Sequence, residues 1–226
     1  MHSDKGVYIF RLELHREPPV TEWALIIGDC VHNVRSAIDH FFWALVIKHH
    51  GGVEPPGTWD AGFPICRDAT AFRKRKIHNF VSPEAAAILE DVQPYHSGGY
   101  GDSTLGFLHK ADIRDKHRLL IESLAMVEKG KVRGERRPGH SPPIGMDTKR
   151  PIQHTLHNDA VVATVVVRPP ESVVDVHLED IRFGIVFDRG GGRTLSVPAA
   201  LDQFIGEAAA LRRRFETIFP IHWPPL

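Results

Sequence analysis

Residues 28–43, GDCVHNVRSAIDHFFW, hold the densest run of chemically active side chains in the chain. At the 100° that each residue of an α-helix advances, the apolar residues share one arc and the polar residues share the other. The polar arc carries two imidazoles, a guanidinium, a hydroxyl, an amide and two carboxylates: Asp29, His32, Asn33, Arg35, Ser36, Asp39 and His40. This set suits general acid–base catalysis or the capture of an anion.

The residues that flank this arc predict that it is covered. Leu25 lies on the polar arc one turn earlier, and Trp43, Val46 and Ile47 lie on it just after. A helix that is apolar all round at both ends is expected to be buried at both ends, which leaves the polar middle partly desolvated. Arg35 and Asp39 are one turn apart and are expected to pair, because unpaired buried ions are costly. The alternative is a satisfied polar network that fixes helix packing or a subunit contact.

A second polar cluster, HKADIRDKHR, covers residues 109–118 and ends where a helix is expected to become a strand. Such a junction is a plausible cleft edge, whereas the alternative is a charged helix C-terminus. We expect this cluster to face the first one. The catalytic candidates are then His40, Arg35, His32, Asp39 and His117, and the binding candidates are Asp29, Asn33, Ser36, Asp115, Lys116 and Arg118.

Metal and polyanion binding are the other chemistries considered. Imidazole and carboxylate groups could bind zinc or iron, but no HExxH or CxxC spacing is present, and Arg35 within the cluster disfavours a cation. No metal and no cofactor is therefore predicted. The runs Arg73–Lys76 and 129–150 are the local positive patches, which could together contact phosphates or simply be solvated.

The strands and helices that must position these residues occur in blocks along the chain. Strands are predicted at 7–14, 118–127, 160–168 and 173–187, and helices at 21–48, 69–79, 83–92, from Asp102 or Ser103 to about 115, and at 197–218. This order predicts an α+β fold, in which a long N-terminal helix and a helical cluster pack with an antiparallel sheet of about four strands. We expect a single domain, 1–226, with a basic loop insertion at about 129–159.

Composition narrows the class of protein. The chain has 226 residues, with 28 basic and 28 acidic side chains, so its zero formal charge argues against a surface built wholly for nucleic acid. Two cysteines cannot form a disulfide framework, which favours a reducing, cytoplasmic setting. The N-terminus shows no signal-peptide pattern, and no apolar run approaches the ~20 residues of a membrane helix, so no membrane partner is expected.

Four segments, in order, resemble an uncharacterised bacterial and phage-borne protein family: GDCVHNVRSAIDHFFWALV, GFPI, DVQPY and DKHRLL. The resemblance spans roughly residues 28–121. It implies that both polar clusters belong to one set with Gly28, Gln93 and Tyr95, and it suggests a prophage-type protein. It supplies no activity.

The pair Arg35 and His40 also resembles the motif of HEPN domains, in which His follows Arg after four to six residues on a helix. These helical modules are often metal-independent ribonucleases. The resemblance implies that His40 is the general base for a ribose 2′-hydroxyl and that Arg35 holds the phosphate, with RNA or a nucleotide as partner. Ser36 departs from the Asn, Asp or His that usually follows the Arg, and the expected strands are no part of such a bundle. The alternative is a non-catalytic binding or homodimerisation protein whose polar patch is structural or binds a small anion.

Overall fold

The computed structural model describes residues 7–13, 15–16, 18–56, 62–117, 123–136, 138–139, 145–149, 159–168, 173–190 and 193–218. Contacts divide the chain into two compact units. The strand unit comprises Met1–Val20 and Glu122–Val197, and the helical unit comprises Thr21–Ile121 and Pro198–Leu226.

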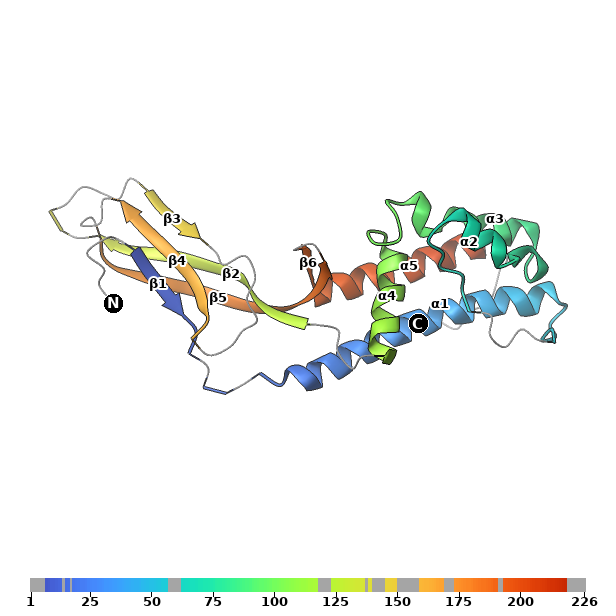
Figure 1. Cartoon of the computed structure of the whole chain (residues 1–226), viewed down its shortest axis with the longest axis horizontal. Helices are drawn as coiled ribbons and strands as arrows, with labels where there is room; N and C mark the ends of the chain where they lie inside the picture. Colours follow the sequence, from blue (N-terminus) through green and yellow to red (C-terminus); the bar gives the residue numbers. More distant parts are fainter. Residues whose placement is uncertain are drawn as a thin grey trace. The chain divides into compact units, whose positions relative to one another are not determined.

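Six strands of the strand unit form two small antiparallel sheets within the described residues (Figure 1). The first has the order β1-β4-β3 and the second the order β2-β5-β6. The strands are β1 (Val7–Arg11), β2 (Ser123–Arg136), β3 (Gly145–Lys149), β4 (Val161–Arg168), β5 (Val173–Gly190) and β6 (Arg193–Ser196). The α+β class is therefore confirmed, whereas the single sheet of about four strands is corrected to two sheets of three.

Valine-rich β4 lies at the centre of the first sheet. Its sequence VVATVVVR is dominated by β-branched residues, which fit a pleated and half-buried surface. Antiparallel pairing places Tyr8 of β1 opposite Val165, and both side chains are buried. They form a small apolar core together with Val167 of β4 and Val176 of β5.

The expected basic loop at 129–159 is in part regular strand, which corrects the prediction. β2 continues through Arg136 and pairs with β5 along its length, and β3 lies within the same region. Lys131 and Arg133, two of the basic residues that suggested a loop, are instead exposed on the ribbon. There Arg133 forms a cross-strand ion pair with Glu179 at 3.7 Å, and His177 lies 3.4 Å from Glu135. The intervening residues 140–144 and 150–158 lie outside the described residues.

The helical unit contains the elements that hold both polar clusters. Its helices are α1 (Val20–His49), α2 (Ala69–Lys74), α3 (Pro83–Asp91), α4 (Thr104–His117) and α5 (Val197–Glu216), with 3-10 turns η1 (Ile77–Asn79) and η2 (Pro94–His96). The predicted helices are confirmed, with one change: the helix expected over 69–79 is divided at Lys76, which has a left-handed φ of 50°. Ser82 caps α3 as expected, because its hydroxyl accepts from Ala85 N at 3.3 Å.

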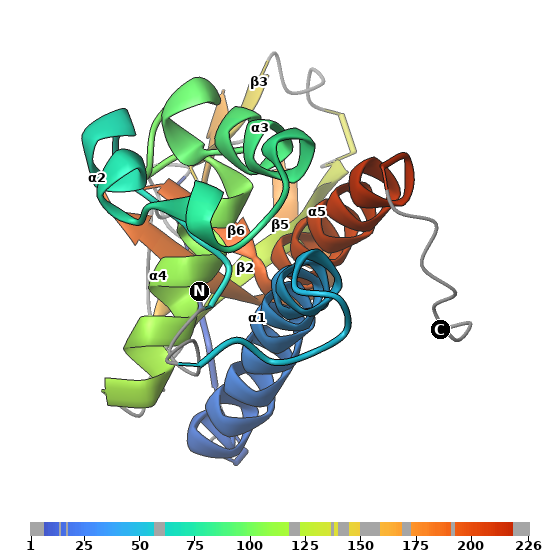
Figure 2. The same cartoon turned by 90° about the vertical axis from the view of Figure 1, so that its right-hand side faces the viewer.

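Large apolar side chains of α1, α3, α4 and α5 make the core of the helical unit. Phe42 of α1, Leu89 of α3, Leu108 of α4 and Phe204 of α5 are all almost completely buried. Figure 2 shows α4 and α5 lying beside α1. In the described part of the chain, no helix is both long and apolar enough to cross a membrane.

Candidate functional site

One stripe of α1 contacts one stripe of α4. A Cβ atom at Gly28 would lie 2.1 Å from Asp115 Oδ1, so the two helices approach at a position where α1 has no side chain. One turn along α1, His32 Nδ1 lies 2.9 Å from Asp112 Oδ1. The two polar clusters of the sequence therefore meet at this crossing, with Gly28 opposite Asp115 and His32 opposite Asp112.

His32 and Asp112 form a dyad at the edge of this contact. Asp112 is only 4% exposed, whereas the His32 side chain is 47% exposed. A carboxylate at Nδ1 favours the tautomer that carries its proton there, which leaves Nε2 as the acceptor. Nε2 lies 3.5 Å from Ser36 Oγ. The dyad thus has the geometry of an oriented imidazole that can exchange protons with a molecule from solvent.

Asp112 is absent from the site predicted from sequence, although its position carried a signal. His109, Asp112 and Asp115 are spaced by three residues, which places them along one face of α4. The charged run at 115–118 drew attention to the helix end instead. Asp115 is half-buried against Gly28, but the side chains of Lys116 and His117, and all of Arg118, lie outside the described residues.

Arg35 points into the interior and binds backbone. Its Nη2 donates to the Phe63 carbonyl at 3.0 Å, and Phe63 N donates to Asp39 Oδ1 at 2.7 Å. Arg35 Nη1 lies 2.8 Å from the same Oδ1 atom, an ion pair without the alignment of a good hydrogen bond. Burial lowers the pKa of Arg35, while the charges of Asp39 and Asp112 oppose this shift. The predicted pairing of Arg35 with Asp39 is confirmed, and the pair clamps the backbone of Phe63.

Gln93 fixes the continuation of the same segment. Its side chain is fully buried, donates to the carbonyls of Pro64 (2.9 Å) and Leu89 (2.7 Å), and accepts from Cys66 N (2.9 Å). The GFPI and DVQPY motifs are therefore two parts of one hydrogen-bonded structure. Nearby, the Tyr95 hydroxyl donates to Glu90 at 2.8 Å.

The remaining polar residues of α1 face solvent. Asp29, Asn33 and His40 are exposed, and no hydrogen bond or ion pair of His40 is seen within the described residues. Five residues of helix separate Arg35 from His40 by about 140°, so their side chains leave α1 in different directions. The apolar residues at the two ends of the polar arc were both expected to be buried. Only the C-terminal end of the arc fits this prediction, because Val46 is buried while Leu25 is 51% exposed.

A half-buried imidazole, His109, lies on α4 one turn before Asp112. Burial, aided by the charge of Arg35, lowers the pKa of His109. Its Nδ1 is buried with no hydrogen-bond partner among the described residues, and its ring meets that of Tyr100 edge-on, with centroids 6.1 Å apart. Burial also raises the pKa of the Tyr100 hydroxyl. Neither residue was among the sequence candidates.

Among the described residues, no group of three or more His, Cys, Asp or Glu side chains is arranged to hold a metal ion. No family model, curated protein or solved structure matches the chain.

Proposed function

We propose that the chain cleaves RNA by acid–base catalysis, with His32 as the base that accepts the proton of a ribose 2′-hydroxyl. The observation that carries the proposal is the 2.9 Å contact between His32 Nδ1 and the buried carboxylate of Asp112. Asp112 orients the ring and stabilises the imidazolium that forms. The cytoplasmic location expected from the two cysteines, both of them free thiols, is part of this proposal.

The reaction needs no group beyond this dyad for its first step. His32 Nε2 takes the 2′-hydroxyl proton, O2′ attacks the adjacent phosphorus, and the bond from phosphorus to the 5′-oxygen breaks. The leaving 5′-oxygen lies opposite O2′ and takes a proton from water, while the imidazolium releases its proton to solvent, so that the products are a 2′,3′-cyclic phosphate and a 5′-hydroxyl. Proton transfer of this kind contributes about 10²–10⁴-fold to a rate.

A substrate that carries its own nucleophile suits the position of the dyad. Ser36 is near His32, but it lies within α1, where the backbone N–H groups are engaged in the helix and cannot form an oxyanion hole. Acyl transfer through Ser36 would lack this stabilisation. RNA supplies the attacking hydroxyl itself, so a base placed by a carboxylate is sufficient to start the reaction.

The role of Arg35 in the proposal is positioning. Its guanidinium binds the Phe63 carbonyl and Asp39 from within the protein, where it places positive charge near Asp112. It is a positioning residue behind the dyad rather than a direct phosphate ligand. This differs from the HEPN-like assignment, in which Arg35 holds the phosphate and His40 is the base.

The test is cleavage of a fluorescent single-stranded RNA by purified variants. We expect His32→Ala and Asp112→Asn to lower the cleavage rate by about 10²-fold or more, because either change removes the oriented base. His40→Ala is the matched control and should cut at the wild-type rate. Loss of cleavage in His40→Ala with full activity in His32→Ala would overturn the proposal in favour of the Arg35 and His40 pair, and RNA left intact by the wild type would reject both.

A non-catalytic role is the second candidate, and the side chains that bind the backbone of segment 62–66 favour it. Arg35, Asp39 and Gln93 all bind the segment 62–66, as a structural network would. In this version the patch stabilises the fold, binds a small anion or contributes to a homodimer. If the role is non-catalytic, wild-type protein leaves RNA intact. Arg35→Ala then lowers the thermal unfolding midpoint, and the shift of that midpoint caused by an added anion is the same in the variant as in the wild type.

A further inference from the structure

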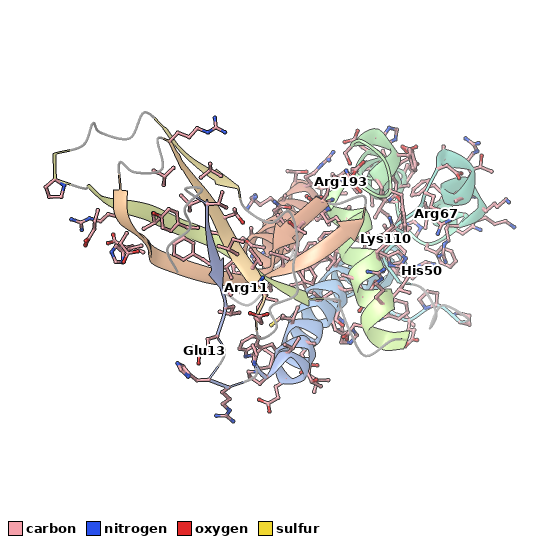
Figure 3. The ribbon with its side chains drawn as sticks, turned by 60° about the vertical axis from the view of Figure 1, so that its left-hand side comes forward. Arg11, Glu13, His50, Arg67, Lys110 and Arg193 are labelled. Carbon is pink, nitrogen blue, oxygen red and sulfur yellow. The ribbon has the colours of Figure 1, made fainter. Side chains whose placement is uncertain are left out.

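Two cations of the helical unit are held against one aromatic ring. The guanidinium carbon of Arg67 lies 5.3 Å from the centre of the Tyr100 ring, and Lys110 Nζ lies 5.4 Å from the same centre. Figure 3 shows Arg67 and Lys110 near each other, although one follows the 62–66 segment and the other belongs to α4. Both side chains are exposed, whereas Tyr100 is half-buried.

The surrounding backbone fixes the position of this ring. A Cβ atom at Gly106 would lie 2.1 Å from the Tyr100 carbonyl oxygen, so α4 and the residue 100 backbone are in close contact. A Cβ atom at Gly101 would lie 3.4 Å from Lys110 Nζ, so the ammonium group lies close to the same turn. The Tyr100 ring is thus a fixed platform, and cation–π attraction orders the two long side chains beside it.

An anion is the kind of ligand that these two cations would bind. Two like charges beside one ring repel each other, and negative charge bound beside them relieves this repulsion. Arg and Lys contact phosphate in different ways, Arg through paired N–H donors and Lys as a compact charge. The Tyr100 ring also connects the two cations to the His32–Asp112 dyad, because Tyr100 contacts His109, which lies one turn from Asp112 on α4.

We propose that Arg67, Tyr100 and Lys110 form a clamp for the phosphodiester backbone of single-stranded RNA. The clamp deepens the proposed function by naming the strand that His32 would cut, and it rests on that function for the reaction but not for binding. Arg67 and Lys110 each neutralise a phosphate, and Tyr100 keeps the two charges in place.

Binding is tested with a fluorescent single-stranded RNA that carries 2′-O-methyl groups throughout, so that no 2′-hydroxyl can attack. Kd is measured across a range of salt concentrations for wild type, Arg67→Ala, Lys110→Ala and Tyr100→Leu. For single strands, the slope of log K against log salt changes by about 0.7 for each phosphate contact. Each cation variant should therefore flatten the slope by about 0.7 and weaken binding severalfold.

Controls separate the clamp from charge in general. Arg213→Ala, on the exposed surface of α5, removes the same charge and should leave the slope unchanged. Tyr100→Leu removes no charge yet should weaken binding, because it removes the ring that both cations contact. Equal slope changes in Arg213→Ala and Arg67→Ala would overturn the clamp, as would wild-type binding by both cation variants.

The outcomes for binding and for cleavage can be told apart. Clamp-dependent binding of the 2′-O-methyl strand without any cleavage of ordinary RNA would leave the clamp standing and reject the catalytic proposal. Cleavage that depends on His32 but is unchanged in Arg67→Ala and Lys110→Ala would reject the clamp alone. Weaker binding through Arg73→Ala or Lys74→Ala, with no effect of Arg67→Ala, would move the contact to α2 and also reject the clamp.

Discussion

The strand unit and the helical unit are stabilised by different kinds of interior. In the described part of the chain, the buried polar side chains are Arg35, Gln93, Ser103 and Asp112, and all of them belong to the helical unit. The described core of the strand unit is apolar. Its ion pair between Arg11 and Asp159 is exposed on both sides.

The difference follows from where each unit has irregular backbone. Strands satisfy their N–H and C=O groups in the ladder, so their interiors need no polar side chains. The segment 62–66 has no regular structure, yet residues 63–66 are buried. Its backbone groups must therefore be satisfied by side chains, and Arg35, Asp39 and Gln93 do this. The polar interior of the helical unit is first a means of holding a loop, and the His32–Asp112 dyad lies at its edge.

The largest expected effect comes from removing the buried cation. Arg35→Ala leaves the Asp39 carboxylate and the Phe63 carbonyl without their partner and should cost about 3 kcal/mol. The matched change in the strand unit, Arg11→Ala, removes an exposed ion pair and should cost less than about 1 kcal/mol. Urea unfolding of both variants measures the contrast. Similar losses in the two variants would break the distinction between the units.

The Gln93 contacts give a second, somewhat smaller effect. Gln93→Leu keeps an apolar interior but leaves the backbone groups of Pro64, Leu89 and Cys66 unsatisfied, at a cost of about 2 kcal/mol. Gln203→Leu, on the exposed face of α5, is the control and should change stability by less than about 0.5 kcal/mol. Thermal denaturation monitored by circular dichroism compares them. A neutral Gln93→Leu would show that solvent, not Gln93, satisfies the segment.

The smallest effect is a pH dependence located in the helical unit. Burial lowers the pKa of His109 below the value of 6.5 that applies when the chain is unfolded. Between the folded pKa and 6.5 the unfolded chain binds more protons, so the free energy of unfolding falls as the pH falls through this window. Above 6.5 the contribution of His109 is constant.

His109→Gln should therefore reduce the loss of thermal stability below pH 6.5, because the group that takes up the proton on unfolding is gone. The comparison variant is His177→Gln in the strand unit, whose imidazole is exposed beside Glu135. Thermal midpoints of wild type and both variants are measured from neutral pH downward. An acid profile in His109→Gln identical to that of the wild type would exclude this residue as the source.

Local periodicity was sufficient for much of the fold. The apolar spacing and capping residues located α1, α3 and α5, and the one-turn spacing of Arg35 and Asp39 predicted their ion pair. The strand predicted over 118–127 overlaps the start of β2, but the same reasoning was wrong for 129–136, because these charged side chains resemble a loop until a partner strand supplies the ladder. It was also wrong for the N-terminal flank of the polar arc, since Leu25 is exposed.

The sequence by itself determined which residues share a face of α1 and which residues begin and end its helices, because both depend on neighbours within a turn or two. Only the tertiary structure decided what those faces meet. His32 and Asp112 are 80 residues apart in the chain, and they come together because Gly28 lets α4 approach α1 closely. Arg35 and Gln93 acquire their roles from a loop whose unsatisfied backbone no local pattern reveals. The physical reason is that helix periodicity is a local property, whereas burial and hydrogen-bond partners depend on segments distant in sequence.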